Sequence, residues 1–439
     1  MLTTELICIT ATYLFVSFFP KKNLIKYIIT GIGGIQSILA LLQYFYILES
    51  SNAFFSVTGF FGNPGQMGCF QTACLIICWQ LLLTCNKTRQ KVFLTLCLIF
   101  IAASILLSDS RSAILSSFVG IAALYHKSIE KLYKTHRWII LPTTIGVFFV
   151  AFLMYCYRSE SVIARLFIWK ISLNMFLTSP ILGIGHNGFI KEYMLYQSEY
   201  FLQHPNSNYI SVADNVMYPY NEALHILVEY GILGFILTLS TIIAILKKAP
   251  DDKAGAPFIA LLFFSMFSYP TYKLGLLILY PICAGFAAKE PAINKKVSYH
   301  HICIISAIIS IASCWNIYHE NVIESHYKFD KFDGEISEKN ISIIRPTCEN
   351  WCLIGDYYVT QRKYPIAEQY YKIAANMIPS RLTPKYSLWK LYLLQDKTED
   401  AHAIAQRIME QRTKIENTTS LKIRSEIREW LSNFEKSSS

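Results

Sequence analysis

The 439-residue sequence has few charged side chains, and this scarcity excludes an ordinary water-soluble protein. Asp, Glu, Lys and Arg make up only 16% of the residues, whereas hydrophobic residues make up 53%. Soluble domains carry roughly 25% charged residues, so water is not the solvent for most of this chain. Charge becomes frequent only after about residue 317. We therefore expect a membrane domain over residues 1–317 and a small soluble domain over residues 318–439.

The sequence also lacks the residue clusters that bind metals. Most of the twelve cysteines lie inside apolar stretches, and Cys348 and Cys352 form a lone C-x-x-x-C pair. No second pair or histidine cluster accompanies them, so we predict no zinc site and no other cofactor. The net charge is +10, but the basic residues stand in short loops beside apolar stretches. That pattern is typical of membrane topology, so we predict no nucleic-acid partner.

What the sequence has in quantity is long apolar stretches. A helix that crosses a bilayer needs about 20 mainly apolar residues. We predict an all-α fold with about ten membrane spans, of which the fifth and the eighth are short. The stretches lie near residues 3–20, 27–48, 66–85, 92–108, 112–125, 138–156, 221–246, 256–271, 274–288 and 299–317.

The distribution of Lys and Arg predicts the orientation of these spans. Alternate short loops hold sixteen Lys and Arg residues, whereas the short loops between them hold only Arg111 and Lys273. Basic residues concentrate in cytoplasmic loops. The long segment near residues 157–220 and the C-terminal domain are therefore predicted to lie outside the cytoplasm.

The spacing of small and aromatic residues near the C-terminus predicts a tetratricopeptide-like repeat, a helix–turn–helix unit of 34 residues. The matching residues are Trp351, Gly355, Tyr358, Ala367, Tyr371, Ala374 and Pro379. Leu388, Tyr392 and Ala401 mark a second, degenerate unit. The alternative is an ordinary helical hairpin. Because stacked repeats present concave peptide-binding surfaces, a protein partner is one implication.

Basic residues at the outer membrane surface are the first candidates for chemistry. Arg111 either extends to the interface beside Asp109 or binds an anion in a cavity. The apolar stretch after Arg165 predicts a helix lying on the outer leaflet, with Arg158, Arg165 and Lys170 on its polar side. Those three contact lipid headgroups or clamp a lipid-linked diphosphate, which the planar guanidinium fork suits.

Residues 183–188 formally contain G-x-G-x-x-G, the dinucleotide-binding pattern. No strand is predicted before them and no β-α-β unit surrounds them, so we reject a nucleotide site. A tight turn rich in Pro and Gly explains the segment better. His186 stands in this turn, and a lone loop histidine is more often exposed than functional.

Three titratable residues enter the apolar stretch after the long loop. Glu222, His225 and Glu229 are spaced at i, i+3 and i, i+4, so they share one helix face. We expect such a face to point away from lipid. A structural polar network and a catalytic group fit the pattern equally well.

Taken in order, four elements resemble the O-antigen ligase/polymerase family of bacterial envelope glycan transferases. They are residues 59–67 around Asn63, Ser110-Arg111-Ser112, Arg165-x-x-x-Trp169 followed by residues 179–189, and Asn221-Glu222 through Glu229-Tyr230-Gly231 to Gly234. Each element alone is weakly specific, whereas the ordered set is fairly specific.

The resemblance implies transfer of a glycan from an undecaprenyl-diphosphate donor at the outer face of the bacterial cytoplasmic membrane. The acceptor is lipid A core, a polysaccharide or a protein Ser/Thr. Arg111 and Arg165 are then expected to hold the diphosphate. Tyr220 stands where the family has a histidine thought to activate the acceptor, and a phenol is a poor base at neutral pH.

Glu222, His225 or His186 could replace that histidine, or the reaction could proceed without a strong base. Two other classes of function remain open: a flippase for lipid-linked glycans that uses the same arginines only for binding, and a non-catalytic scaffold of the cell envelope.

Overall fold

The computed structural model is helical throughout the residues that it describes. Those residues are 2–136, 159–249, 253–288, 296–328, 336–411, 413–414 and 416–438. Within them the only extended pairing is an isolated bridge between Asn52 and Phe55. The predicted all-α class is confirmed. The chain divides into two compact units, and helix α10 contributes to both.

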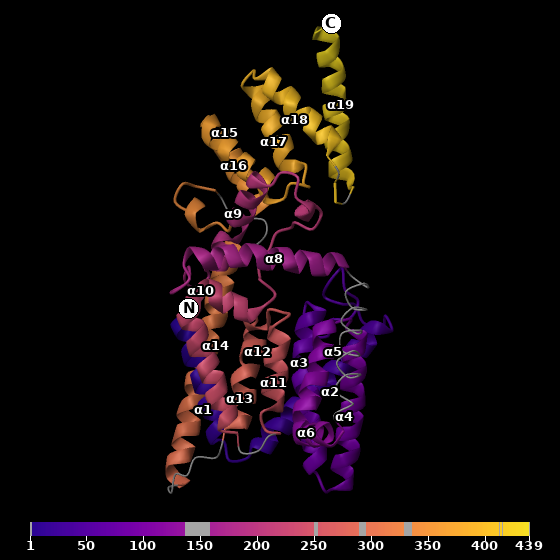
Figure 1. Cartoon of the computed structure of the whole chain (residues 1–439), viewed down its shortest axis with the longest axis vertical. Coiled ribbons are helices and arrows are strands. Elements are labelled where there is room, and N and C mark those ends of the chain that lie inside the picture. Colours follow the sequence, from indigo (N-terminus) through magenta and orange to yellow (C-terminus); the bar gives the residue numbers. More distant parts are fainter. Residues whose placement is uncertain are drawn as a thin grey trace. The chain divides into compact units, whose positions relative to one another are not determined.

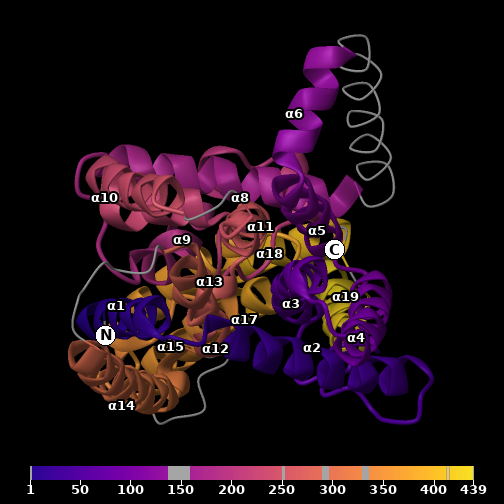
Figure 2. The ribbon, with the colours of Figure 1, turned by 90° about the horizontal axis from the view of Figure 1, so that it is seen from below.

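The first unit holds the membrane helices. It comprises residues 1–151, 220–223 and 234–320, and its helices lie side by side (Figures 1 and 2). The helices are α1 (Leu2–Phe18), α2 (Lys22–Tyr44), α3 (Pro64–Thr84), α4 (Thr88–Leu107), α5 (Arg111–Leu124), α6 (His126–Thr135), the C-terminal part of α10 (Glu222–Lys247), α11 (Ala256–Ser265), η3 (Pro270–Tyr272), α12 (Leu274–Leu277), α13 (Leu279–Ala287) and α14 (Lys296–Lys328).

Helix α3 is the centre of this unit because small residues let its neighbours approach closely. It packs against α2, α4, α5 and α11. A Cβ atom added to Gly68 of α3 would lie 2.7 Å from the Cβ of Ala113 on α5, and one added to Gly33 of α2 would lie 2.7 Å from the Cβ of Cys74. Small residues at helix contacts are the usual basis of helix packing in membranes.

Each predicted stretch that the structure describes contains a helix, but the bounds differ: α11, for example, covers only Ala256–Ser265 of the stretch 256–271. Six described helices are long and apolar enough to cross a membrane, and the apolar helices at residues 3–18, 111–124, 256–265 and 274–287 are shorter. The predicted stretch 138–156 lies outside the described residues. About ten spans therefore stays a prediction. Helix α8, expected on the membrane surface, is among the six by length and composition.

Helix α2 begins at Lys22, five residues before its predicted start, and this lysine contacts a second helix. The ammonium group of Lys22 donates to the carbonyls of Ala288 at 2.8 Å and Gly285 at 3.2 Å. These carbonyls lie at the C-terminal end of α13, where backbone acceptors lack a partner within the helix. The charged cluster thus joins two helices in addition to marking a loop.

The second unit combines the long loop with the C-terminal region. It comprises residues 152–219, 224–233 and 321–439. Its helices are α8 (Ser159–Thr178), α9 (Gly188–Gln203), η2 (Asn208–Ser211), η4 (Ile341–Ile343), α15 (Cys348–Thr360), α16 (Tyr364–Met377), α17 (Thr383–Leu394), α18 (Thr398–Glu410) and α19 (Thr418–Ser438).

Helices α15 to α19 form a stack in which each helix packs against the next along the chain (Figure 1). Gly355 of α15 allows the ring of Tyr371 on α16 to approach its backbone, and Tyr371 donates to the carboxylate of Asp356 at 2.5 Å. Ala367 and Ala374 are fully buried in the same core. The tetratricopeptide assignment itself stays a prediction.

The C-terminal stack is attached to the loop by a buried contact with α9. Gln197 of α9 donates to the carbonyl of Met377 at 2.6 Å, and Ser198 donates to the carbonyl of Ile373 at 3.0 Å. The buried guanidinium of Arg345 donates to the carbonyl of Val216 at 3.1 Å. Buried polar groups without such partners would destabilise the fold, so these contacts specify how the two parts meet.

Replacing Gly355 with alanine is expected to destabilise the C-terminal stack. The new Cβ would lie 2.4 Å from the Tyr371 ring, which is buried and held by its hydrogen bond to Asp356. Overpacking of this kind costs about 1–3 kcal/mol. Thermal unfolding of the full-length protein should show a lower melting temperature for the stack. Ser425→Ala on the exposed surface of α19 is the control, and equal melting of both variants would contradict the prediction.

Candidate functional site

A kink in helix α10 organises the candidate site. Gly231 interrupts the helix with φ 64° and ψ −168°. In an unbroken helix the carbonyls of Val228 and Glu229 would accept from the N–H groups four residues later. The kink removes these bonds and leaves two donors and two acceptors without partners inside the helix.

The turn at residues 180–185 satisfies all four of these backbone groups. The N–H groups of Ile184 and Gly185 donate to the carbonyls of Val228 and Glu229 at 2.9 and 3.0 Å. In return, the carbonyls of residues 180 and 181 accept from the N–H groups of residues 232 and 233 at 2.9 and 3.4 Å. The predicted turn is thus a docking partner for the broken helix.

Two glycines make this approach possible. Gly183 has φ 75°, and a Cβ there would lie 2.3 Å from the carbonyl carbon of Glu229. A Cβ on Gly231 would lie 2.2 Å from the carbonyl oxygen of Ile181. Both positions combine a positive φ with backbone contact, conditions that only glycine meets without strain. The glycines of the rejected dinucleotide pattern therefore include one that serves backbone packing.

A carboxylate with two imidazoles lies immediately before the kink. Glu229 is only 2% exposed, and its Oε1 atom lies 3.2 Å from Nε2 of His225. Its Oε2 atom lies 3.9 Å from Nδ1 of His186, which also contacts the hydroxyl of Tyr230 at 2.7 Å. The N–H of Phe189, in the first turn of α9, donates to Oε1 at 3.3 Å.

This group can hold and move a proton. The carboxylate accepts hydrogen bonds and so orients the neighbouring imidazole, and imidazole is the side chain most often used for proton transfer. The side chains of His225 and His186 are 14% and 24% exposed, so both are half-buried. Burial raises the pKa of neighbouring Tyr193 on α9 well above its ordinary value, which keeps that phenol protonated.

Helix α8 carries the predicted basic residues of the loop. Arg165 is half-buried, and Trp169, one turn later, donates from Nε1 to the carbonyl of Pro219 at 2.9 Å. The tryptophan thus attaches α8 to the end of the loop.

Lys170 lies over the rings of Tyr200 and Tyr209, with its Nζ 4.7 and 5.6 Å from the ring centroids. The ammonium group of Lys170 is therefore attracted to the faces of these two rings by cation–π interactions. Arg158 lies outside the described residues.

Three predicted residues belong to the membrane-helix unit. Arg111 is the first residue of α5 and is half-buried, so its guanidinium and the N-terminal backbone donors of α5 together favour an anion. Glu222 begins α10 and is buried; it accepts from the backbone N–H of Thr271 at 3.2 Å and from its hydroxyl at 2.5 Å. Asn63 caps α3 by accepting from the N–H of Gly65 at 2.7 Å.

The Tyr220–Asn221 step is a sharp bend before α10. Tyr220 has φ 53°, in the left-handed region, and its ring makes an edge contact with Tyr269 at 5.0 Å between centroids. Hydrogen bonds from Thr271 make Glu222 a structural acceptor in this bend. The predicted residue that gathers titratable neighbours is Glu229.

Two contacts of the site were not predicted from the sequence. Tyr230 contacts His186, and the N–H of Phe189 contacts Glu229, more than 35 residues away in each case. The glycine flanking Glu229-Tyr230 was the available signal, because a glycine inside an apolar helix indicates a kink or a close approach. Among the described residues, no group of three or more His, Cys, Asp or Glu side chains is arranged to hold a metal ion.

Substitution of glycines around the kink is expected to produce a graded loss of stability. Gly183→Ala adds a backbone clash to an unfavourable φ, Gly185→Ala adds only the unfavourable φ of 94°, and Gly62→Ala adds neither. Strain in such a φ region costs about 1–3 kcal/mol. Melting temperatures of the three purified variants should fall in the order Gly62→Ala, Gly185→Ala, Gly183→Ala. A Gly183→Ala protein as stable as the Gly62→Ala protein would contradict the close approach of the 180–185 turn to the kink of α10.

Comparisons with known proteins address the same segment. No curated protein and no solved structure matches the chain. The family model for O-antigen ligase matches residues 96–239, which include Arg111, Arg165, the 180–185 turn and the kink of α10. The resemblance to the O-antigen ligase family is therefore confirmed over residues 96–239, which contain three of the four ordered elements.

Proposed function

We propose that this protein is an integral membrane glycosyltransferase that moves a glycan from undecaprenyl diphosphate to an acceptor at the outer face of the bacterial cytoplasmic membrane. The observation that carries the proposal is the match of the O-antigen ligase model over one segment, residues 96–239. That segment contains Arg111 and Arg165. It also contains Glu229, His225, His186 and Tyr230, which we call the Glu229 cluster. Family membership implies glycan transfer in a membrane, and the donor, side and acceptor are inferred.

The arginines supply the electrostatic part of the reaction. An acceptor hydroxyl attacks the anomeric carbon of the glycan, a new C–O bond forms, and the bond from that carbon to the diphosphate oxygen breaks. Negative charge grows on the departing diphosphate. The guanidinium groups of Arg111 and Arg165 are each suited to bind two of the diphosphate oxygens at once. Such binding stabilises the transition state most where water is excluded.

The Glu229 cluster supplies the proton acceptor. The attacking hydroxyl must lose its proton as the new bond forms. His225 would take that proton, and Glu229 would stabilise the resulting imidazolium across the 3.2 Å contact. His186 and Tyr230 extend the same hydrogen-bonded group. In this proposal Tyr220, at the family's histidine position, shapes the bend before α10 and takes no proton.

The acceptor stays open among lipid A core, a growing polysaccharide and a protein Ser/Thr. The positive-inside pattern supports an external position for the loop and the C-terminal region. Packing of α9 against the C-terminal stack supports a role for that stack beside the transferase segment.

Replacing Arg111 or Arg165 with alanine in the native host is expected to stop transfer. Removing one preorganised donor of this kind lowers the rate about 10²–10³-fold. Lipid-linked glycan should accumulate outside the cytoplasm while the finished conjugate disappears, as measured by glycolipid extraction and conjugate staining. Arg428→Ala on the exposed surface of α19 is the matched control and should leave transfer unchanged.

Other outcomes identify the competing functions. Donor glycan trapped on the cytoplasmic face would support a flippase. Unchanged donor and conjugate in both arginine variants, at normal protein levels, would contradict transfer and flipping alike and favour a scaffold.

Glu229→Gln and Tyr220→Phe together test the proton acceptor. Glu229→Gln keeps the shape of the side chain but removes its charge, so transfer from lipid-linked donor should fall about 10²–10⁴-fold. Tyr220→Phe should keep most of the activity because its phenol takes no proton. The measurement is the initial rate of glycan transfer from lipid-linked donor by each purified variant. An active Glu229→Gln protein beside an inactive Tyr220→Phe protein would reverse the assignment.

A further inference from the structure

A cavity of about 390 Å³ lies within the second unit, between the loop and the C-terminal stack. Ala213 and Asp214 contribute from the loop, and the connections before α17 and before α19 contribute from the stack. Its volume falls near the lower end of small-molecule sites, roughly 300–1,000 Å³. Nothing in the proposed transfer chemistry uses this cavity.

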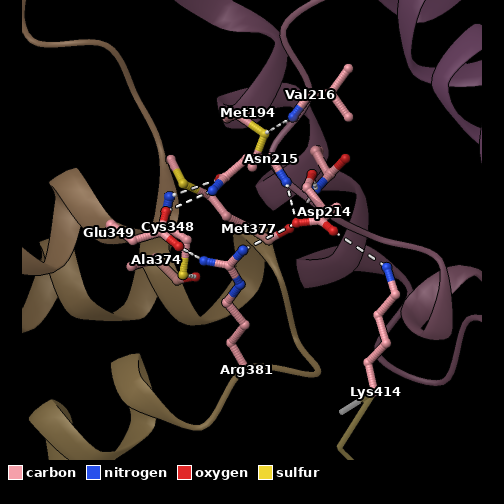
Figure 3. Close-up of polar contacts among 11 residues, drawn as sticks. Met194, Asp214, Asn215, Val216, Cys348, Glu349, Ala374, Met377, Arg381 and Lys414 are labelled. Carbon is pink, nitrogen blue, oxygen red and sulfur yellow. Dashed lines mark hydrogen bonds and ion pairs between the residues drawn. The ribbon is translucent and has the colours of Figure 1, made fainter. Parts of the chain in front are cut away.

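Ion pairs connect residues of the loop and of the stack beside the cavity (Figure 3). The guanidinium of Arg381 contacts Asp214 at 3.1 Å and also contacts Glu349, and the ammonium of Lys414 lies 3.3 Å from the other oxygen of Asp214. Asn215 donates to Glu349 at 2.6 Å. Two cations therefore face two carboxylates, so the charges of these four side chains balance.

The cavity also presents hydroxyl groups above an apolar floor. Ser380, Thr383, Thr413 and Thr419 line it, and no hydrogen bond within the described part of the chain uses their hydroxyls. Ser380 is only 6% exposed, and its hydroxyl is among those that line the cavity. Hydroxyls of this kind can both donate to a ligand in the cavity and accept from it. The floor consists of the buried side chains Ala213, Ile378, Leu382 and Ile423.

We propose that this cavity binds a sugar unit of the glycan substrate. A sugar ring has apolar C–H faces and a rim of hydroxyls that both donate and accept. The apolar floor matches the first property, and the serine, threonines and ion-paired side chains match the second. This inference rests on the proposed function, and it assigns to the C-terminal stack a share in recognising the glycan.

Charge and shape favour a neutral sugar over other ligands. A phosphate would need cations without counterions, whereas Arg381 and Lys414 both already face carboxylates. A peptide bound by stacked helices lies along their concave face. This cavity is instead bounded by loop residues and by the ends of helices α17 and α19.

Sugar binding can be measured with the full-length protein in lipid nanodiscs by saturation-transfer difference NMR. One probe is the oligosaccharide freed by mild acid from the host's own lipid-linked donor; the other is the oligosaccharide of the acceptor part of the finished conjugate. Binding of the first assigns the cavity to the donor glycan, and binding of the second alone assigns it to the acceptor. Inorganic phosphate should displace neither.

Two adjacent threonines provide a matched pair of variants. Thr419 lines the cavity and Thr418 does not, although both are exposed in the first turn of α19. Thr419→Trp should fill the cavity and remove the sugar signal, and Thr418→Trp should leave it unchanged. Ser380→Ala removes one hydrogen bond and should weaken binding about 2–10-fold.

Equal sugar binding by the Thr418→Trp and Thr419→Trp proteins would overturn the proposal. So would the absence of binding by the unmodified protein while it still transfers glycan in cells, an outcome that leaves the proposed function intact. Displacement by phosphate would identify an anion site and would also overturn it. Loss of transfer function is tested separately by the Arg111 and Arg165 variants.

Discussion

The exchange of backbone hydrogen bonds between the 180–185 turn and the kink of α10 is the constraint on which the candidate site depends. A break inside an apolar helix leaves N–H and C=O groups that water does not reach, and each unpaired group is costly. The turn supplies the two donors and two acceptors that the break requires. The position of the kink, and therefore of the residues just before it, is fixed by this pairing.

Glu229 owes its surroundings to the same pairing. Docking of the turn brings His186 to one oxygen of the carboxylate and starts α9 so that the N–H of Phe189 reaches the other. His225 comes from the preceding helical turn of α10 itself. The motif residues therefore divide into two kinds. Gly183 and Gly231 permit the close approach, whereas Glu229 and its histidines offer proton chemistry.

The loop and the C-terminal region share one packed interior. Gln197 and Arg345 are buried polar side chains whose partners are backbone carbonyls on the opposite part, and Asp214 faces cations of the stack. A region attached only by a flexible connection would not bury such groups. Helix α9 thus contacts Glu229 at its start and the C-terminal stack along its length, which links glycan recognition in the stack to the transferase segment in our proposal.

The sequence by itself determined the helical class, the apolar stretches, the turn after α8 and the family, because these depend on local composition and on short spacings. Only the tertiary structure decided which groups meet. His186 reaches Tyr230 across 44 residues, and Lys170 lies on Tyr200 and Tyr209. Such contacts depend on how helices pack, and no local pattern in the sequence encodes that packing.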